Sequence, residues 1–191
     1  ELTGTAISNA FEQNTSETDV IERTITFEYQ GMTASTVITQ GVWINQYYTL
    51  DLNSQWQEST KPNPDSMLYD GVYESFSNKG KDNTAAIMYI DIVGYESFSL
   101  YIRSNAESNF DYVMVSQLDQ AINNNSSYSN TTLVKAHTYG YQQSGTALSS
   151  YRLVEFTGID GGEHRITIVY RKDASASSGD DKGYILIPNN Q

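Results

Sequence analysis

The sequence predicts an all-β protein whose larger part is an antiparallel jelly-roll β-sandwich. Short runs of alternating apolar and polar residues recur at roughly the ten-residue spacing that is typical of sandwiches and jelly rolls. The chain is rich in residue types that favour strands, including 15 tyrosines among its 191 residues, and turn-forming Asn, Gly and Ser separate the runs. Helical spacing of apolar residues is hard to find, which favours strands over helices.

The first clear element is a hairpin over residues 23–40, "RTITFEYQGMTASTVITQ". Ile25, Phe27 and Tyr29 alternate with polar residues before the turn, and the alternation resumes after it. A short turn between two alternating runs is the signature of a hairpin, so Gln30-Gly31 is predicted to form the turn. We expect both strands to be half buried.

From residue 46 onward, further strand-like runs are separated by turn residues. The loop at 61–66 contains two of the three prolines of the chain, and prolines remove donors and oppose regular strand pairing. A second polar loop covers 173–181, and no repeat of solenoid or propeller period is present. The expected strands lie within 47–59, 71–78, 84–93, 96–104, 110–118, 133–141, 150–159, 164–172 and 183–188.

The composition excludes several functional classes. With 23 Asp and Glu against 11 Lys and Arg, the formal net charge is -12, which argues against a nucleic-acid partner and against anionic membrane surfaces. Cysteine is absent, so disulfides, thiolate zinc sites and a cysteine nucleophile are excluded. No apolar run approaches the length of a membrane span, so no membrane insertion is expected. The chain begins at Glu1 in polar sequence, and we expect it to be a mature or trimmed fragment.

Residues 8–41, "SNAFEQNTSETDVIERTITFEYQGMTASTVITQG", resemble the final strands of the BACON family. The resemblance lies in the polar "NTSETD" segment, the "RTITFEY" strand, the "QGMTAS" turn and the closing "TVITQ". It implies an immunoglobulin-like module of Bacteroidetes surface and secreted proteins, or of phages that infect these bacteria. Residues 1–44 would then be a partial module, whose exposed strand edges invite another chain to pair.

Residues 46–191 resemble the jelly-roll sandwiches of Bacteroidetes cell-surface and phage structural proteins, which are similar to galactose-binding-like and carbohydrate-binding modules. The resemblance rests on "LDLNSQW", "YESFSNKG", "MYIDIVGYESFSLYIRSNAESNFDYVMVS" and "GGEHRITIVYRKDASASSGDDKGYILIP". It implies a second domain over 45–191. Ligand residues vary among such modules, so none is transferred.

Two tyrosine clusters are candidate ligand sites. A tyrosine offers an apolar ring face and a polar tip, and neighbouring amides add the hydrogen bonds that a sugar needs. The alternative is that these tyrosines pack across strands or between the domains. The candidate ligand residues are Tyr139, Tyr141, Gln142, Gln143, Tyr47 and Tyr48.

A structural calcium ion is the one candidate cofactor. Such ions are common in jelly-roll binding modules, and Asp173, Asp180 and Asp181 in the "DASASSGDD" loop offer the hard oxygen ligands that calcium prefers. The loop lacks EF-hand spacing, and the alternative is a solvated turn.

The charged elbow "FSLYIRSNAESNFDYVMVSQLD" (98–119) is interpreted as architectural. Arg103 near a strand end, with Glu107 and Asp111 close in sequence, is expected to tie the elbow by ion pairs or carbonyl contacts. Phe98, Leu100 and Ile102 should share one strand face, opposite Tyr101 and Arg103.

No catalytic arrangement emerges from the sequence. His137 and His164 are the only histidines, and neither an H-E-x-x-H nor a G-x-S-x-G motif is present. Nothing in the linear spacing selects a carboxylate pair for glycoside hydrolysis. We therefore predict that the chain is not an enzyme.

The sequence favours a non-catalytic glycan-binding or adhesion module of the extracellular space or the cell surface. Its partner would be a mucin or polysaccharide glycan, or another protein chain, and a homo-oligomer is a candidate assembly. The alternative is a structural module of a phage fibre or tail appendage, located on the virion surface.

Overall fold

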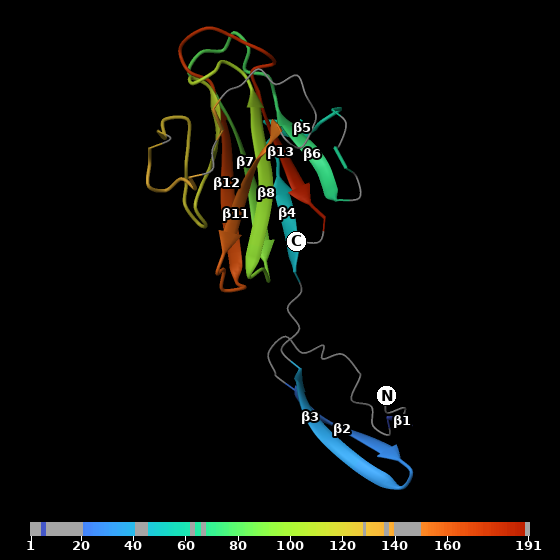
Figure 1. Ribbon diagram of the computed structural model, residues 1–191. Helices are drawn as coiled ribbons and strands as arrows, with labels where there is room; N and C mark the ends of the chain where they lie inside the picture. Colours follow the sequence, from blue (N-terminus) through green and yellow to red (C-terminus); the bar gives the residue numbers. More distant parts are fainter. Residues whose placement is uncertain are drawn as a thin grey trace. The chain divides into compact units, whose positions relative to one another are not determined.

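The computed structural model describes residues 5–6, 21–40, 46–61, 64–65, 68–127, 129–135, 138–139 and 150–189. The chain divides into two compact units, Glu1–Asn45 and Gln46–Gln191. Figure 1 shows the strands of each unit with their labels.

The first unit contains a three-stranded antiparallel sheet in the order β1 (Thr5–Ala6), β2 (Ile21–Tyr29) and β3 (Met32–Gln40). The predicted hairpin and its turn are confirmed, because Tyr29 pairs with Met32 across Gln30 and Gly31. These two turn residues have φ angles of 50° and 76°, as a type I′ turn requires.

The expected burial of this hairpin is wrong for the middle of β3. The side chains from Met32 to Val37 are all exposed, and those two apolar residues are 66% and 60% exposed. A cross-strand hydrogen bond of 2.9 Å between the hydroxyls of Thr26 and Ser35 is itself exposed. Alternation in sequence gives a buried face only where another layer covers the strand.

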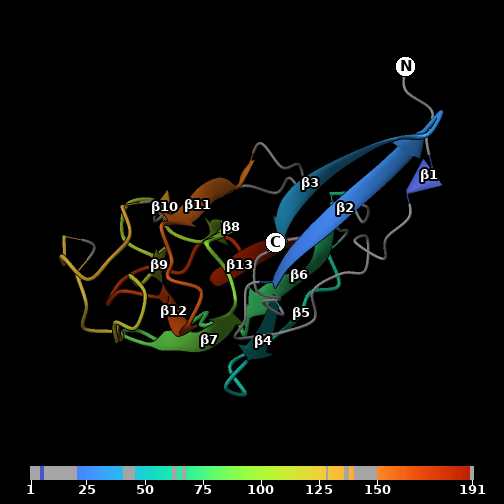
Figure 2. The same ribbon diagram turned by 90° about the horizontal axis from the view of Figure 1, so that it is seen from below.

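The second unit is an antiparallel sandwich of two five-stranded sheets, which confirms the predicted all-β class. Seen from the end of the strands, the two sheets form two layers (Figure 2). The first sheet has the order β10 (Thr138–Tyr139), β9 (Tyr112–Val115), β12 (Glu163–Arg171), β7 (Ala85–Val93) and β4 (Tyr47–Asp51). The second has the order β11 (Arg152–Thr157), β8 (Ser97–Asn105), β13 (Lys182–Pro188), β6 (Tyr69–Ser75) and β5 (Trp56–Glu58).

The last two strands of the chain occupy the centres of the two sheets. Strand β12 pairs with β7 on one side and with β9 on the other. Strand β13 pairs with β6 and β8 in the same way. Neither sheet is therefore complete until the C-terminal strands β12 and β13 have paired with their neighbours.

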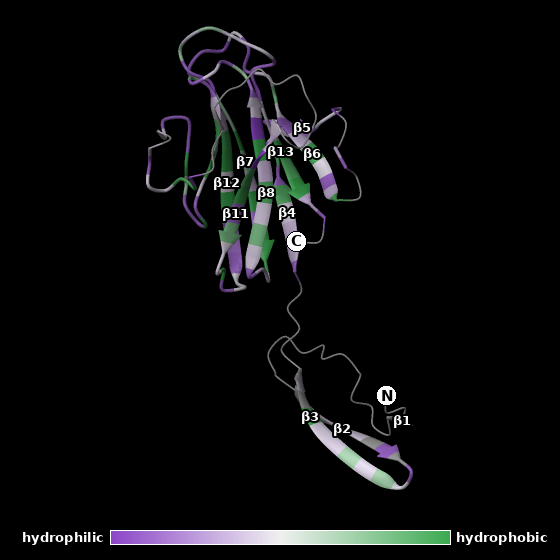
Figure 3. Ribbon diagram, in the orientation of Figure 1, coloured by the Kyte–Doolittle hydropathy of each residue, from purple (hydrophilic) through white to green (hydrophobic). Residues whose placement is uncertain are grey.

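The core lies between the sheets and follows the alternation of the strands. Along β7, Ala86, Met88, Ile90 and Ile92 are buried while their neighbours are only partly so. Burying one such aliphatic side chain contributes about 1.5–3 kcal/mol. Figure 3 shows this hydropathy pattern, with hydrophobic residues along β7 and β12 and hydrophilic residues in the loops at the strand ends.

The outer faces of both sheets are also partly covered. On the first sheet, Ile122 and Leu133 of the 117–135 connection pack against Met114 and Val169. On the second sheet, Tyr69, Val72, Tyr184 and Leu186 form a separate cluster, with Tyr101 and Tyr151 packed against it. Strands β12 and β13 are consequently buried on both sides over most of their length.

The predicted faces of β8 are confirmed, and the predicted tie between Arg103 and the elbow stays a prediction. Phe98, Leu100 and Ile102 belong to the inner core, whereas Tyr101 belongs to the outer cluster. Arg103 is 2% exposed, and its guanidinium lies 4.1 Å from the ring centre of Tyr184 and 5.1 Å from that of Tyr151. Asp111 is paired with Lys172.

Replacing Arg103 with alanine is expected to lower the melting temperature of the second unit. The substitution removes two desolvated cation–π contacts, each worth up to about 2 kcal/mol. Thermal unfolding followed by circular dichroism measures the effect, and Arg103→Lys, which keeps the charge but loses the planar stack, should fall between the two. Loss of ligand binding with an unchanged melting temperature would show that Arg103 acts in binding.

Candidate functional site

Among the described residues, one candidate site is an open polar cleft of about 340 Å³ on the second unit. It lies beside the end of β6 and the beginning of β13, next to the turn at 76–80 and the loop at 173–181. We call it the lysine cleft. Its lining residues are Thr60, Lys61, Glu74, Ser77, Lys79, Gly179, Asp180, Lys182 and Tyr184.

The register of the paired strands positions the residues at the bottom of the lysine cleft, which we call its floor. Glu74 on β6 is opposite Gln57 on one side and Tyr184 on the other, and Tyr184 is opposite Arg103. These four residues therefore form one row across the outer face of the sheet, because directly paired residues point to the same side. Arg103 stacks beneath Tyr184 from the next strand and holds the tyrosine ring in place.

Glu74 is the more buried of the two carboxylates in the lysine cleft. Its Oε1 accepts hydrogen bonds from Lys182 Nζ at 2.6 Å and Gln57 Nε2 at 3.1 Å, and its Oε2 accepts one from Ser59 Oγ at 2.7 Å. Burial by itself raises the pKa of Glu74, but these hydrogen bonds outweigh it and hold the pKa below its ordinary value. Glu74 is therefore ionised at neutral pH.

Asp180 is the second carboxylate of the lysine cleft. Its Oδ2 accepts hydrogen bonds from Asn105 Nδ2 at 2.8 Å and the Tyr184 hydroxyl at 2.9 Å, and Lys61 Nζ lies 3.4 Å away. Burial raises the pKa of Asp180, but the contacts from Tyr184, Asn105 and Lys61 reverse the effect and lower it. Both carboxylates thus carry their full negative charge.

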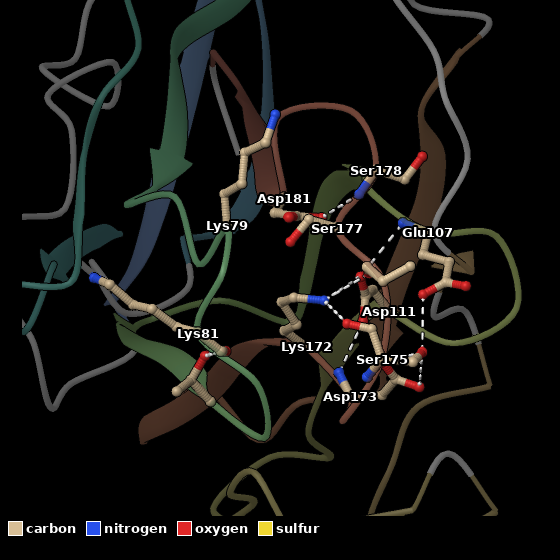
Figure 4. A network of polar contacts seen from close by, with 12 residues as sticks. Lys79, Lys81, Glu107, Asp111, Lys172, Asp173, Ser175, Ser177, Ser178 and Asp181 are labelled. Carbon is tan, nitrogen blue, oxygen red and sulfur yellow. Dashed lines mark hydrogen bonds and ion pairs between the residues drawn. The ribbon is translucent and has the colours of Figure 1, made fainter.

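Lys79 differs from the other two lysines of the lysine cleft. Its side chain is exposed, and none of the described residues forms an ion pair with its ammonium group. Figure 4 shows Lys79 extending away from the polar network of the neighbouring loop. Its charge is therefore available to a ligand.

A buried ion pair closes the end of the core next to this cleft (Figure 4). Lys172 and Asp111 are both fully buried, with Nζ 3.8 Å from Oδ2. Lys172 Nζ also donates to the carbonyl oxygens of Ser175 and Ala176 at 3.0 and 2.8 Å. The backbone N–H of Asp173 donates to Asp111 Oδ1 at 2.8 Å. Lys172 is therefore a counterion of the buried Asp111 carboxylate.

The three aspartates predicted to bind calcium have different surroundings. Asp173 accepts hydrogen bonds from Ser175 at 2.8 to 2.9 Å, Asp180 faces the lysine cleft, and Asp181 is fully buried, with Oδ1 accepting from the Ser178 N–H at 3.1 Å. Among the described residues, no group of three or more His, Asp or Glu side chains is placed to hold a metal ion. The calcium site stays a prediction.

The predicted tyrosine sites lie partly in the described structure. Tyr47 on β4 is 49% exposed, whereas the Tyr48 hydroxyl donates to Asp70 and its ring lies edge-on to Phe98, with centroids 5.9 Å apart. Tyr139 is in β10, where its backbone pairs with that of Tyr112. Tyr141, Gln142, Gln143 and His137 lie outside the described residues.

His164 is held between two carboxylates at the start of β12. Nδ1 lies 2.7 Å from Asp119 Oδ2, and Nε2 lies 2.8 Å from Asp160 Oδ1. The hydrogen bonds with Asp119 and then Asp160 raise the pKa of His164 above its ordinary value. With acceptors on both ring nitrogens, His164 is a charged structural clasp, and neither nitrogen is left as a base.

Stability should fall as the pH rises through the raised pKa of His164. The charged clasp contributes fully below the ordinary histidine pKa of about 6.5 and is lost above the folded-state value. Because Asp119 is about half exposed, we expect a loss of about 1 kcal/mol or less. Urea unfolding between slightly acidic and alkaline pH measures it. The loss should be absent in His164→Gln, and a pH dependence that persists in this variant would show that another group is responsible.

The lysine cleft was missed by sequence reasoning. Lys61, Lys79 and Lys182 are 18 or more residues apart and follow no motif. The one available signal was the scarcity of basic residues in an acidic chain, because three of the 11 come together here.

Comparisons with known proteins give little further information. No family model matches the chain, and no curated protein matches it in sequence. A solved structure of the CBM51-2 and INT domains of ZmpB from Clostridium perfringens aligns with 98% of the chain at 9% identity and a TM-score of 0.34, and the chain spans 41% of that structure. This likeness is too slight to bear on function. The resemblance of residues 8–41 to the BACON family stays a prediction. In the described parts of the chain, no helix is long and apolar enough to cross a membrane.

Proposed function

We propose that the chain is a non-catalytic glycan-binding module of a cell-surface, secreted or virion-surface protein. The observation that carries this proposal is the lysine cleft, an open hollow in which ammonium, hydroxyl and carboxylate groups surround the edge of a fixed tyrosine. Sugars present many hydroxyl groups, and each one can accept from an ammonium or donate to a carboxylate.

The charge state of the lysine cleft favours binding over hydrolysis. Glycoside hydrolysis needs one carboxylic acid that is still protonated when it meets the glycosidic oxygen. The pKa values of Glu74 and Asp180 are both lowered, since lysine ammonium groups and other donors stabilise their charged forms. Neither carboxylate of the lysine cleft is therefore a protonated general acid.

A glycan array with matched variants tests the proposal. We expect the wild-type protein to bind one or more glycans, and the double variant Lys61→Ala/Lys79→Ala to lose that signal. Lys81→Ala, which removes an exposed lysine outside the cleft, is the matched control and should bind as the wild type does. Silence of the wild-type protein across a broad array that includes mucin and plant polysaccharides would contradict the proposal.

Tyr139, Tyr141, Gln142 and Gln143 remain proposed ligand residues, together with Tyr47 and Tyr48. The double variant Tyr139→Ala/Tyr141→Ala belongs in the same array for this reason. If it loses the signal while the lysine variants keep it, the region of Tyr139 and Tyr141 is the binding surface and the lysine cleft is not.

Assembly of a surface or virion structure is the second candidate function. It is favoured by β3, which is an edge strand of its three-stranded sheet and exposes Met32 and Val37. An exposed edge with apolar side chains is a template for pairing with another chain. Light scattering tests it, because a stable trimer or higher oligomer would support assembly and a monomer at high concentration would contradict it.

A further inference from the structure

We infer that the lysine cleft selects sugars bearing a carboxylate or sulfate group over neutral sugars. This inference rests on the proposed function and specifies its ligand class. The cleft is lined by three ammonium groups against two carboxylates, in a protein whose net charge is -12. It is thus a locally positive hollow on a negative molecule, a position where an anion is attracted by its immediate surroundings.

The two ion pairs of the lysine cleft differ in how firmly they are held. Lys182 Nζ is 2.6 Å from Glu74 Oε1, whose side chain is 5% exposed, so this pair is fixed. Lys61 and Asp180 are 3.4 Å apart, with side chains 39% and 40% exposed. An exposed pair of this kind contributes little, so Lys61 is free to exchange Asp180 for a ligand anion.

Asp180 does not lose its partners when Lys61 turns away. The Tyr184 hydroxyl and Asn105 Nδ2 still donate to the same oxygen at 2.9 and 2.8 Å. Lys61 can therefore join Lys79 in contacting an anion without leaving a buried charge unpaired. The structure assigns Lys61 and Lys79 to the anionic group, and Lys182 and Glu74 to fixing the floor beneath it.

The rest of the molecule limits how densely the ligand can be charged. A polyanion such as a nucleic acid needs an extended basic face to neutralise successive phosphates. The lysine cleft offers one hollow, and the overall charge of the protein repels a dense line of anions. The ligand class is consequently a glycan with isolated acidic groups among neutral hydroxyls, and the exposed Thr60 in the lining offers a hydroxyl to the latter.

Three oligosaccharide series of equal length test the inference by calorimetry: neutral galactans, galacturonates and sulfated galactans. We expect an acidic series to bind at least tenfold more tightly than the neutral one, and its affinity to fall as salt is added. A preference for the galacturonates or for the sulfated galactans identifies which anion the site takes.

Charge variants provide the second arm of this test. Loss of one charge-assisted hydrogen bond in Lys79→Ala should weaken acidic ligands by about tenfold to a hundredfold, and Lys79→Glu should weaken them further, while neutral sugars change little. Lys81→Glu makes the same change in net charge outside the lysine cleft and should have a much smaller effect. Because Lys79 and Lys81 are exposed, both variants should melt like the wild type.

The outcomes separate this inference from the proposed function. Equal affinity for neutral and acidic series, with neutral binding lost in Lys61→Ala/Lys79→Ala, would overturn the anion preference and leave glycan binding intact. Equal weakening by Lys79→Glu and Lys81→Glu would also overturn it, because the effect would then be that of net charge. Absence of binding to all three series and across the array would overturn both.

Discussion

Replacing Lys172 with methionine is expected to lower the free energy of unfolding by about 3–5 kcal/mol. The substitution keeps most of the side-chain volume but removes the ammonium group that lies 3.8 Å from the buried carboxylate of Asp111. Both side chains are fully buried, so water cannot replace the lost partner. Removing one member of such a pair is far more damaging than the pair is stabilising, since an uncompensated charge stays in the core.

The loss of stability in Lys172→Met should be larger than the loss of the ion pair alone, because Lys172 makes further contacts. The Nζ atom also joins the carbonyl oxygens of Ser175 and Ala176, which fixes the course of the 173–181 loop. This loop continues into β13, the central strand of its sheet. Methionine offers no donor to either carbonyl, so the loop that leads into β13 loses an anchor as well.

Urea unfolding measures this effect against two controls. Lys81→Met makes the same chemical change at an exposed position and should alter stability by less than about 0.5 kcal/mol. The double variant Lys172→Met/Asp111→Leu removes both charges and should recover much of the loss. If Lys172→Met is as stable as the wild type, the pair is solvated and the interpretation of a closed core end is wrong.

A valine at position 183 should destabilise the second unit by at least the 1–3 kcal/mol typical of overpacking. Gly183 is the second residue of β13 and lies on the inner face, where an added Cβ would be 2.8 Å from Val113 Cγ2, 3.0 Å from Tyr170 Cβ and 3.1 Å from Trp56 Cη2. These neighbours come from three different strands and have no room to move apart. The Gly183 N–H also donates to Ser75 Oγ at 2.9 Å inside the core, so β13 cannot shift without breaking that bond.

Gly71 provides the matched control for this substitution. It lies on the neighbouring strand β6, and an added Cβ would be 3.6 Å from the nearest atoms of Tyr73, which is ordinary contact. Gly71→Ala should therefore be close to neutral, whereas Gly183→Ala should already be destabilising. Thermal melts of the three variants settle the comparison, and equal stability of Gly183→Val and the wild type would contradict the close packing at Gly183.

Local patterns in the sequence were enough to predict the sheet class and the strand faces. The two-residue period of Phe98, Leu100 and Ile102 identified the inner face of β8 because side-chain direction alternates within any strand. The turn at Gln30 and Gly31 was likewise readable, since both adopt the positive φ angles of a two-residue hairpin. These features depend on neighbours in sequence alone.

Contacts between distant strands could not be predicted in the same way. Arg103 and Asp111 are close in sequence, but Arg103 lies in β8 of one sheet, whereas Asp111 comes just before β9 of the other. The true partner of Asp111 is 61 residues further along the chain. The lysine cleft depends on the same kind of long-range pairing, because only the placement of β13 beside β6 brings Lys182 to Glu74.

The most direct test of the central claim is to map a bound glycan onto the protein by nuclear magnetic resonance. The ¹⁵N-labelled protein would be titrated with a glycan that binds on the array, and amide shifts recorded for every assigned residue. If the lysine cleft is the glycan site, the largest changes will fall on Lys61, Lys79, Gly179 and Asp180, and they will disappear in Lys61→Ala/Lys79→Ala. Changes confined to the regions around Tyr47 or Tyr139, with the lysine cleft unaffected, would contradict the claim.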